Sequence, residues 1–188
     1  MKFSRGVMGV LMLAGLGLLA SGLYIPAKAH LAQWLIQRAW QAAQVDGERV
    51  VPWSWADTAP VGRLRAPDHG KDYVVLAGVS GEALAFGPGH MLASATPGSA
   101  GHTIIGGHRD THFGFLQSVA RGDRFELEGL NGVSRTYQVE DIRVVNINED
   151  PLELQPDLPR LTLITCYPFD AVAPGGPWRY VVDASISL

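Results

Sequence analysis

The sequence contains little cysteine and little charge. One cysteine stands among 188 residues, so no disulfide bond can form within the chain. Charged residues make up only 18% of the chain, the net charge is -3, and the basic residues form neither a cluster nor a stripe interleaved with aromatic residues. These absences exclude nucleic acid as a partner. With 47% hydrophobic residues and no repeat or low-complexity tract, the composition predicts one globular domain plus an apolar segment.

The apolar segment lies at the N-terminus. Lys2 and Arg5 precede an uncharged stretch over residues 6–27, which as a helix rising 1.5 Å per residue can cross a hydrocarbon core of ~30 Å. Two basic residues before the stretch and only Lys28 just after it predict that the short end lies in the cytoplasm. Residues 1–27 are therefore predicted to be a cytoplasmic tip and a single-pass anchor in the inner (cell) membrane, with the rest of the chain on the periplasmic side.

A cleaved signal peptide is the alternative for this segment. Ala27, Lys28 and Ala29 fit the small-residue pattern of a signal-peptidase site. The apolar run is longer than the 7–15 residues usual for a signal peptide's apolar region, however. We therefore favour an uncleaved anchor.

Residues 28–59 are expected to connect the anchor to the domain. Apolar residues recur at helical spacing from Leu31 to Ala43, which predicts a juxtamembrane amphipathic helix that ends near residues 46–48. Trp34 and Trp40 of this helix could lie at the membrane interface or pack against the domain. Residues 52–58 read as a linker, so the domain is expected to span residues 60–188.

The domain sequence consists of short strand-like runs divided by glycine, proline and aspartate. Such runs without alternating helical segments predict a mainly all-β, closed or sandwiched antiparallel architecture. The expected strands cover residues 73–79, 102–106, 123–128, 135–147, 161–167 and 178–186.

The single cysteine, Cys166, ends one of these runs directly before Tyr167 and Pro168. A lone cysteine can be a small buried hydrophobic residue. A nucleophilic thiol instead needs a base or cation to hold the thiolate and donors to receive an oxyanion. Candidates for both lie in the stretches around His108 and Arg179, each of which follows or opens a strand.

The histidines near residue 108 allow two interpretations. His108 and His112 are four residues apart, a spacing that on a helix would suit a metal ion. Gly106 and Gly107 interrupt regular structure, however, and Cys166 lies far along the chain. We therefore predict no metal and no cofactor, with His108 facing a cleft at a strand end and His102, like His112, structural.

Arg179 also has two interpretations. An arginine on a strand is often a solvated surface charge. Because the strand of Arg179 follows that of Cys166 after one loop, its guanidinium could instead reach the same cleft, where five fixed donors suit a carbonyl or an oxyanion.

Three stretches together resemble the sortases, a family of membrane-anchored cysteine transpeptidases, and most closely the branch from Gram-negative proteobacteria near class D. They read Gly-His-Arg-Asp-Thr-His-Phe (107–113), Thr-Leu-Ile-Thr-Cys (162–166) and Trp-Arg-Tyr-Val-Val (178–182). The resemblance implies an eight-stranded β-barrel with short helices. It also implies that His108, Cys166 and Arg179 are catalytic. For Arg179 it therefore favours a functional role over a solvated surface charge.

The function implied by this resemblance is cleavage of the C-terminal sorting signal of a secreted protein through a thioester on Cys166. Transfer to an amine acceptor follows, and neither the signal sequence nor the acceptor is specified by these residues. Two alternatives remain: a non-catalytic, membrane-anchored β-domain that binds envelope proteins, and an L,D-transpeptidase-like peptidoglycan enzyme. The latter expects an arginine two residues after the cysteine, where this chain has Pro168.

Overall fold

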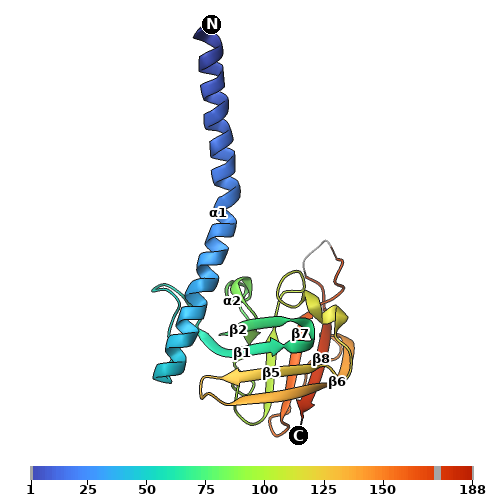
Figure 1. The fold of residues 1–188 in the computed structure, drawn as a ribbon. Helices are drawn as coiled ribbons and strands as arrows, with labels where there is room; N and C mark the ends of the chain where they lie inside the picture. The colour runs from blue at the N-terminus through green and yellow to red at the C-terminus, as the bar shows by residue number, and fades with distance from the viewer. Residues whose placement is uncertain (1, 172–174, 188) are drawn as a thin grey trace.

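Alternation of apolar and polar residues gives the chain strands with one inward and one outward face. In the computed structural model of the protein, which describes residues 2–171 and 175–187, eight strands close into a barrel in the order β1-β2-β3-β4-β7-β8-β6-β5 (Figure 1). The strands are β1 (Pro60–Ala66), β2 (Lys71–Ala77), β3 (Gly89–His90), β4 (His102–Gly106), β5 (Arg124–Gly129), β6 (Ser134–Asn146), β7 (Arg160–Cys166) and β8 (Trp178–Ile186).

Helical elements are few in the described part of the chain. A long α-helix precedes the barrel, and one short α-helix and two 3-10 turns lie in its connections. They are α1 (Lys2–Asp46), η1 (Pro67–His69), α2 (Gly81–Phe86) and η2 (Gly114–Ser118). The predicted β-barrel with short helices is confirmed.

The strand pairing departs from the expected antiparallel pattern in two places. The β2–β3 and β4–β7 pairs are parallel, whereas β1, β5, β6 and β8 make antiparallel pairs. A parallel pair needs a long crossover, and residues 107–159, which contain η2, β5 and β6, form the one between β4 and β7. A sequence that shows only short strands and turns gives no sign of such a crossover, so the parallel pairs were not predicted.

Two strands were missed in the sequence. In β1 the buried Gly62, Leu64 and Ala66 alternate with the partly exposed Arg63 and Arg65, a period of two that the arginines disguise. The other missed strand, β3, is only two residues long. No periodicity can be recognised over that length.

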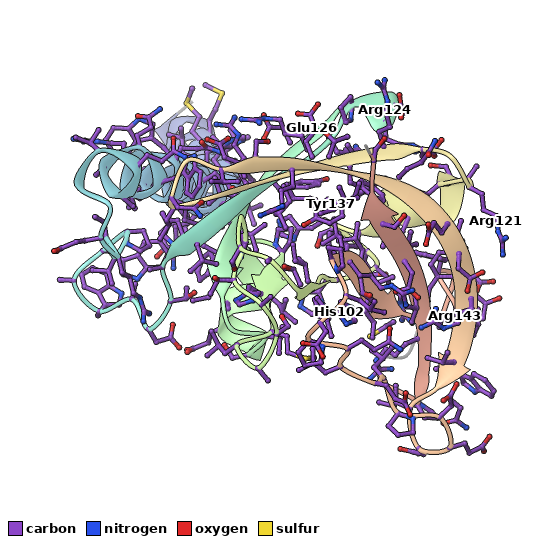
Figure 2. All side chains as sticks on the ribbon, turned by 90° about the horizontal axis from the view of Figure 1, so that it is seen from below. His102, Arg121, Arg124, Glu126, Tyr137 and Arg143 are labelled. Carbon is purple, nitrogen blue, oxygen red and sulfur yellow. The ribbon has the colours of Figure 1, made fainter. Side chains whose placement is uncertain are left out.

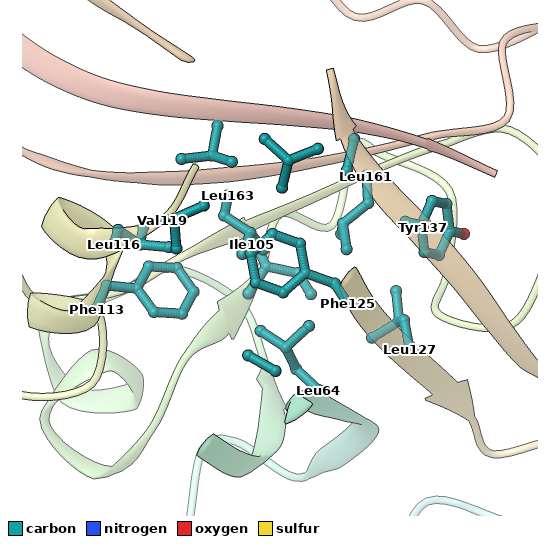
Figure 3. Close-up of a cluster of buried hydrophobic side chains, with 14 of the residues drawn as sticks. Leu64, Ile105, Phe113, Leu116, Val119, Phe125, Leu127, Tyr137, Leu161 and Leu163 are labelled. Atoms are coloured by element: carbon teal, nitrogen blue, oxygen red, sulfur yellow. The ribbon is translucent and has the colours of Figure 1, made fainter. Parts of the chain in front are cut away.

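The barrel interior is filled by side chains from all sides (Figure 3). Inward-facing Leu161 and Leu163 of β7 lie in one cluster with Ile105 of β4 and Phe125 of β5. Phe113, from the segment after β4, closes the cluster near one end and is fully buried. Because a one-residue slip would turn every side chain of a strand to the other face, this packing fixes the register of β4 and β7.

Helix α1 replaces the two separate segments expected at the N-terminus. It runs without interruption through Pro26, and the portion Gly6–Val45 is long and apolar enough, by length and composition, to cross a membrane. Figure 1 shows its N-terminal half projecting away from the barrel and its C-terminal half lying beside it. The segments predicted as an anchor and as a juxtamembrane helix are thus parts of one helix.

The C-terminal half of α1 packs on the barrel through one face. Ile36 and Trp40 are 2% exposed and contact Val74 and Leu76 of β2. Trp34, by contrast, is 52% exposed, with the Arg38 guanidinium 4.7 Å from its ring. Of the two positions left open in the sequence, Trp40 packs against the barrel and Trp34 does not.

Replacing Trp40 with alanine should therefore destabilise the protein by about 3–5 kcal/mol, the usual cost of removing a buried tryptophan. Chemical unfolding of the full chain in detergent micelles measures this loss. Trp34→Ala is the matched control and should change the free energy of unfolding by less than about 1 kcal/mol, as expected at exposed positions. Equal losses in the two variants would contradict the packing of α1 on β2.

Candidate active site

Cys166 is the last residue of β7 and lies on the outer face of the barrel. Leu161, Leu163 and Thr165 of the same strand are buried on the inner face, so the alternation turns Cys166 outward, where its side chain is partly buried. Cys166 is paired directly with Arg179 of β8. Because the Tyr167 N–H donates to the Trp178 carbonyl at 3.1 Å, the Cys166–Arg179 pair falls at the closer, non-hydrogen-bonded position of the ladder.

His108 reaches the same place through the parallel pairing of β4 with β7. The ladder pairs Gly106 with Ile164, and the Gly107 N–H continues it by donating to the Ile164 carbonyl at 3.1 Å. The Thr165 hydroxyl donates to the Gly107 carbonyl at 2.7 Å. These two bonds place the turn of the exposed His108, the residue after Gly107, beside the end of β7.

The turn that carries His108 depends on a glycine. A Cβ atom at Gly107 would lie 2.7 Å from the ring of Phe113, too close for any other residue without displacing that buried ring. The Phe113 N–H donates in turn to the His108 carbonyl at 2.9 Å. The aromatic ring in the core therefore sets the path of the backbone at His108.

The Arg179 guanidinium is partly engaged by the backbone. Its Nη1 donates to the carbonyls of Gly176 at 2.7 Å and of Trp178 at 2.9 Å. Its Nε and Nη2 make no hydrogen bond to residues 2–171 or 175–187. The N–H groups of Nε and Nη2 can therefore donate hydrogen bonds to a ligand.

The neighbouring histidines are held by other contacts. His112 is half-buried with its ring against Tyr73, at a centroid distance of 5.6 Å, and the His90 ring bonds to the Ala95 carbonyl at 3.0 Å. Burial lowers the pKa of both imidazoles, and the charge of His108 lowers that of His112 further. Across the described residues, no group of three or more His, Cys, Asp or Glu side chains could hold a metal ion.

A polar recess lies further along the same outer face. It has a volume of about 240 Å³ and is lined by β4, β6, β7, β8 and the loop before β7. Figure 2 labels His102 and Arg143, which lie in its wall and come from β4 and β6. The side-chain oxygen of Gln155, also in the wall, is buried without a hydrogen-bond partner among the described residues.

A chain of hydrogen bonds crosses the floor of this recess. The Gln155 N–H donates to His102 Nδ1 at 3.2 Å, so the proton of the neutral ring is on Nε2 and is donated to the Thr162 hydroxyl at 2.7 Å. Thr162 donates to Asp183, and Asp183 pairs with Arg143. The buried Asp183 carboxylate therefore has partners at both oxygens.

Two features of this region were not predicted from the sequence. The first is the polar chain from His102 to Arg143, whose members come from four strands. The second is Arg109, which is 7% exposed although it stands between the exposed His108 and Asp110. An Arg-Asp step in a turn normally indicates solvent-exposed charges, so no local signal marks Arg109 as buried.

Comparison with known proteins assigns the family. The family model of the sortase domain matches residues 64–187, which include all three candidate residues and nearly the whole barrel. The chain belongs to the sortase family. The alternative of an L,D-transpeptidase is thereby removed.

Within the family the similarity is to class D. The chain is 30% identical over 122 residues to Sortase D of Bacillus subtilis (strain 168), a match that covers 64% of this chain and 61% of that protein. The chain thus spans about three fifths of the curated relative that it matches. The expected likeness to class D sortases is confirmed.

Solved structures agree with this assignment. The catalytic domain of SrtD from B. anthracis is 31% identical with a TM-score of 0.58, covering 68% of this chain and 87% of that one. A Sortase D5 transpeptidase from Clostridium perfringens shares the fold with a TM-score of 0.66 at 19% identity, covering 84% of this chain and 99% of that one.

The buried histidines predict how stability depends on pH. Burial lowers the pKa of His102 below its usual 6.5, with Arg160 and Arg143 acting in the same direction and Asp183 opposing them. Below about pH 6.5 the unfolded chain therefore binds protons that the folded chain does not, and the free energy of unfolding falls by up to about 1.4 kcal/mol per pH unit for each such histidine. Thermal unfolding between pH 8 and pH 5 should show this decline.

The variant His102→Gln tests how much of this loss of stability at low pH comes from His102. The decline below about pH 6.5 should become shallower by one histidine's contribution. His30→Gln, at an exposed position on α1, should leave the decline unchanged. If His102→Gln and the native chain lose stability in parallel, His102 takes no part in the acid effect.

Proposed function

We propose that the protein is a membrane-anchored cysteine transpeptidase that acts on a secreted protein with a C-terminal sorting signal. The signal is cut through a thioester on Cys166, and the acyl group passes to an amine acceptor. One observation supports the proposal: in a member of the sortase family, Cys166 is paired with Arg179 across β7 and β8, and the turn that carries His108 is hydrogen-bonded through Gly107 to the end of β7.

In the first step the thiolate of Cys166 attacks the carbonyl carbon of the scissile peptide bond. A C–S bond forms, the carbonyl oxygen becomes an oxyanion, and Arg179 stabilises it with hydrogen bonds. As the C–N bond breaks, protonated His108 gives its proton to the leaving amine. The products are the free C-terminal fragment and a thioester.

In the second step an incoming amine attacks the thioester carbonyl. Neutral His108 accepts the proton from the amine nitrogen, and the sulfur leaves as thiolate when the C–S bond breaks. Water in place of the amine gives hydrolysis. Cys166 is only partly buried and His108 is exposed, which gives a second substrate access to the thioester.

The anchor forms part of the same proposal. Residues 6–27 of α1 would span the inner membrane, with Lys2 and Arg5 on the cytoplasmic side and the barrel on the periplasmic side. This arrangement would present the barrel to secreted proteins in the cell envelope.

Removing the proposed catalytic groups should abolish or slow acyl transfer in a folded barrel. Cys166→Ala should form no covalent adduct. His108→Ala should slow adduct formation by roughly 10² to 10⁴ through loss of proton transfer, and Arg179→Ala by roughly 10² to 10³ through loss of oxyanion donors. Incubation with a library of sorting-signal peptides, followed by mass spectrometry of the intact protein with and without hydroxylamine, measures the thioester.

Matched controls separate catalysis from folding. His112→Ala removes a nearby imidazole and should cost far less activity than His108→Ala, while all variants should unfold cooperatively. Arg179→Lys keeps the charge but loses the planar fork, so a large loss in this variant points to paired donors. A folded Cys166→Ala variant with full peptide-cleaving activity would falsify the enzyme assignment and favour a binding domain.

The position of the anchor can be tested separately. Membrane fractionation should recover the full-length chain with the inner membrane, and protease added to spheroplasts should digest the barrel, because residues 6–27 stay in the membrane with the short end inside. Replacing Lys2 and Arg5 with glutamine should weaken this orientation, because the orientation follows from the Lys/Arg bias. Recovery of a shortened, soluble periplasmic product that starts near His30 would instead identify a cleaved signal peptide.

A further inference from the structure

Arg109 is a buried charge with no part in the proposed chemistry. Its side chain is only 6% exposed, although His108 before it and Asp110 after it are exposed. Burying a guanidinium is costly unless its donors find acceptors. The hydrogen-bond partners of Arg109 should therefore indicate the role of its buried side chain.

The partners of Arg109 lie in the segment that follows the cysteine. Its Nη1 donates to the Pro168 carbonyl at 2.9 Å, and its Nη2 donates to the Ala171 carbonyl at 2.6 Å. The weaker contact from Nε to the Asp110 carboxylate is 3.3 Å long, and that carboxylate is 69% exposed. The two short bonds tie the segment after Cys166 to the turn that carries His108.

A second arginine holds the other end of the same connection. Arg179 Nη1 donates to the Gly176 carbonyl, just before β8. The Pro168–Ala171 segment also packs inward, because the Phe169 ring lies 5.1 Å from the ring of Tyr180 and packs against the core. Among the described residues, the β7–β8 connection is thus held near the end of β7 by Arg109 and near the start of β8 by Arg179. Val172, Ala173 and Pro174 lie outside the described residues.

The groups of the site do not themselves depend on Arg109. Cys166 is held by the β7–β8 ladder, and His108 is held by the bonds of Gly107 to Ile164 and of Phe113 to His108. Loss of the Arg109 fork should therefore release the Pro168–Ala171 segment and leave the register of the three site residues intact. The expected result is a change in how substrate is held, more than in how fast the bound substrate reacts.

We propose that Arg109 is a positioning residue that holds the Pro168–Ala171 segment against the turn of His108 and thereby forms one wall of the substrate groove at Cys166. The planar guanidinium is required because two carbonyls three residues apart accept from two different nitrogens of one fork. A lysine ammonium is a point charge and cannot reproduce this geometry. The role in substrate binding rests on the transpeptidase function proposed above.

The test compares Arg109→Lys and Arg109→Gln with the native full-length chain in detergent micelles. In both variants, amide hydrogen exchange at Ala171, whose N–H donates to the Pro168 carbonyl at 3.4 Å, should accelerate about tenfold or more, the factor expected when the hydrogen bonds that hold this segment to a charged group are lost. Exchange in β4, β7 and β8 should stay unchanged. With a sorting-signal peptide, KM should rise about tenfold while kcat changes by less than about threefold, the pattern of lost uniform binding.

Arg63→Lys is the matched control, because Arg63 also forms a two-pronged contact, to Asp72 at 2.7 Å on β1 and β2. It should leave both exchange in the segment and KM unchanged. Native-like exchange and KM in both Arg109 variants would overturn the proposal. Global unfolding of both variants, with protection lost in every strand, would also overturn it by identifying Arg109 as a general core residue.

The two proposals fail in different ways. If the native chain forms no acyl adduct with any peptide, the transpeptidase function is lost. The exchange measurement still decides whether Arg109 positions the segment. If the native chain does form the adduct and the Arg109 variants lose kcat instead of KM, the groove-wall role is wrong while the function stands.

Discussion

The parallel pairing of β4 with β7 is the constraint on which the site depends. In a parallel pair both strands end at the same edge of the sheet, so the turn after β4 and the last residue of β7 lie side by side. Since β8 runs antiparallel to β7, its first residues lie at that edge too. Three segments far apart in the chain thus meet without any contact among the three side chains being needed for folding.

The register of that pairing comes from the barrel interior. Ile105 is paired with Leu163, and both side chains are fully buried in the core. The neighbouring positions, from Thr162 through Cys166 in steps of two, therefore face outward. A slip of one residue would bury the thiol and expose the leucines, so apolar packing inside the barrel fixes the position of the proposed site on its outer face.

Outside the barrel, side-chain hydrogen bonds hold the loops in addition to the packing of Phe169 against the core. Arg109 holds backbone carbonyls after Cys166, and the chain from His102 through Asp183 holds the loop before β7 through Gln155. Such contacts contribute less than core packing and depend on geometry and charge.

The sequence predicted what depends on local pattern, and it missed what depends on distant pairing. Runs such as residues 102–106 and 178–186 were predicted to the residue because they are apolar and bounded by glycine or proline. The strand β1 was missed because Arg63 and Arg65 fill its outer face. The burial of Arg109 follows only from the packing of β4 beside β7, which no window of sequence contains. The roles proposed for His108, Cys166 and Arg179 came from family resemblance. The structure adds that Cys166 is paired with Arg179 and that the turn of His108 is hydrogen-bonded to the end of β7.

The continuous helix α1 sets how this edge of the barrel lies relative to the proposed anchor. Figure 1 shows β8 running away from the N-terminal half of α1 toward the C-terminus, so the start of β8 lies at the edge nearer that half. Ile36 and Trp40 fix the barrel to α1, and at 1.5 Å per residue Ile36 lies only about 14 Å beyond residue 27. If residues 6–27 span the membrane as proposed, the packing of Trp40 holds the thiol edge turned toward the membrane. The same helix would then both retain the protein at the membrane and set which way the edge that carries Cys166 faces.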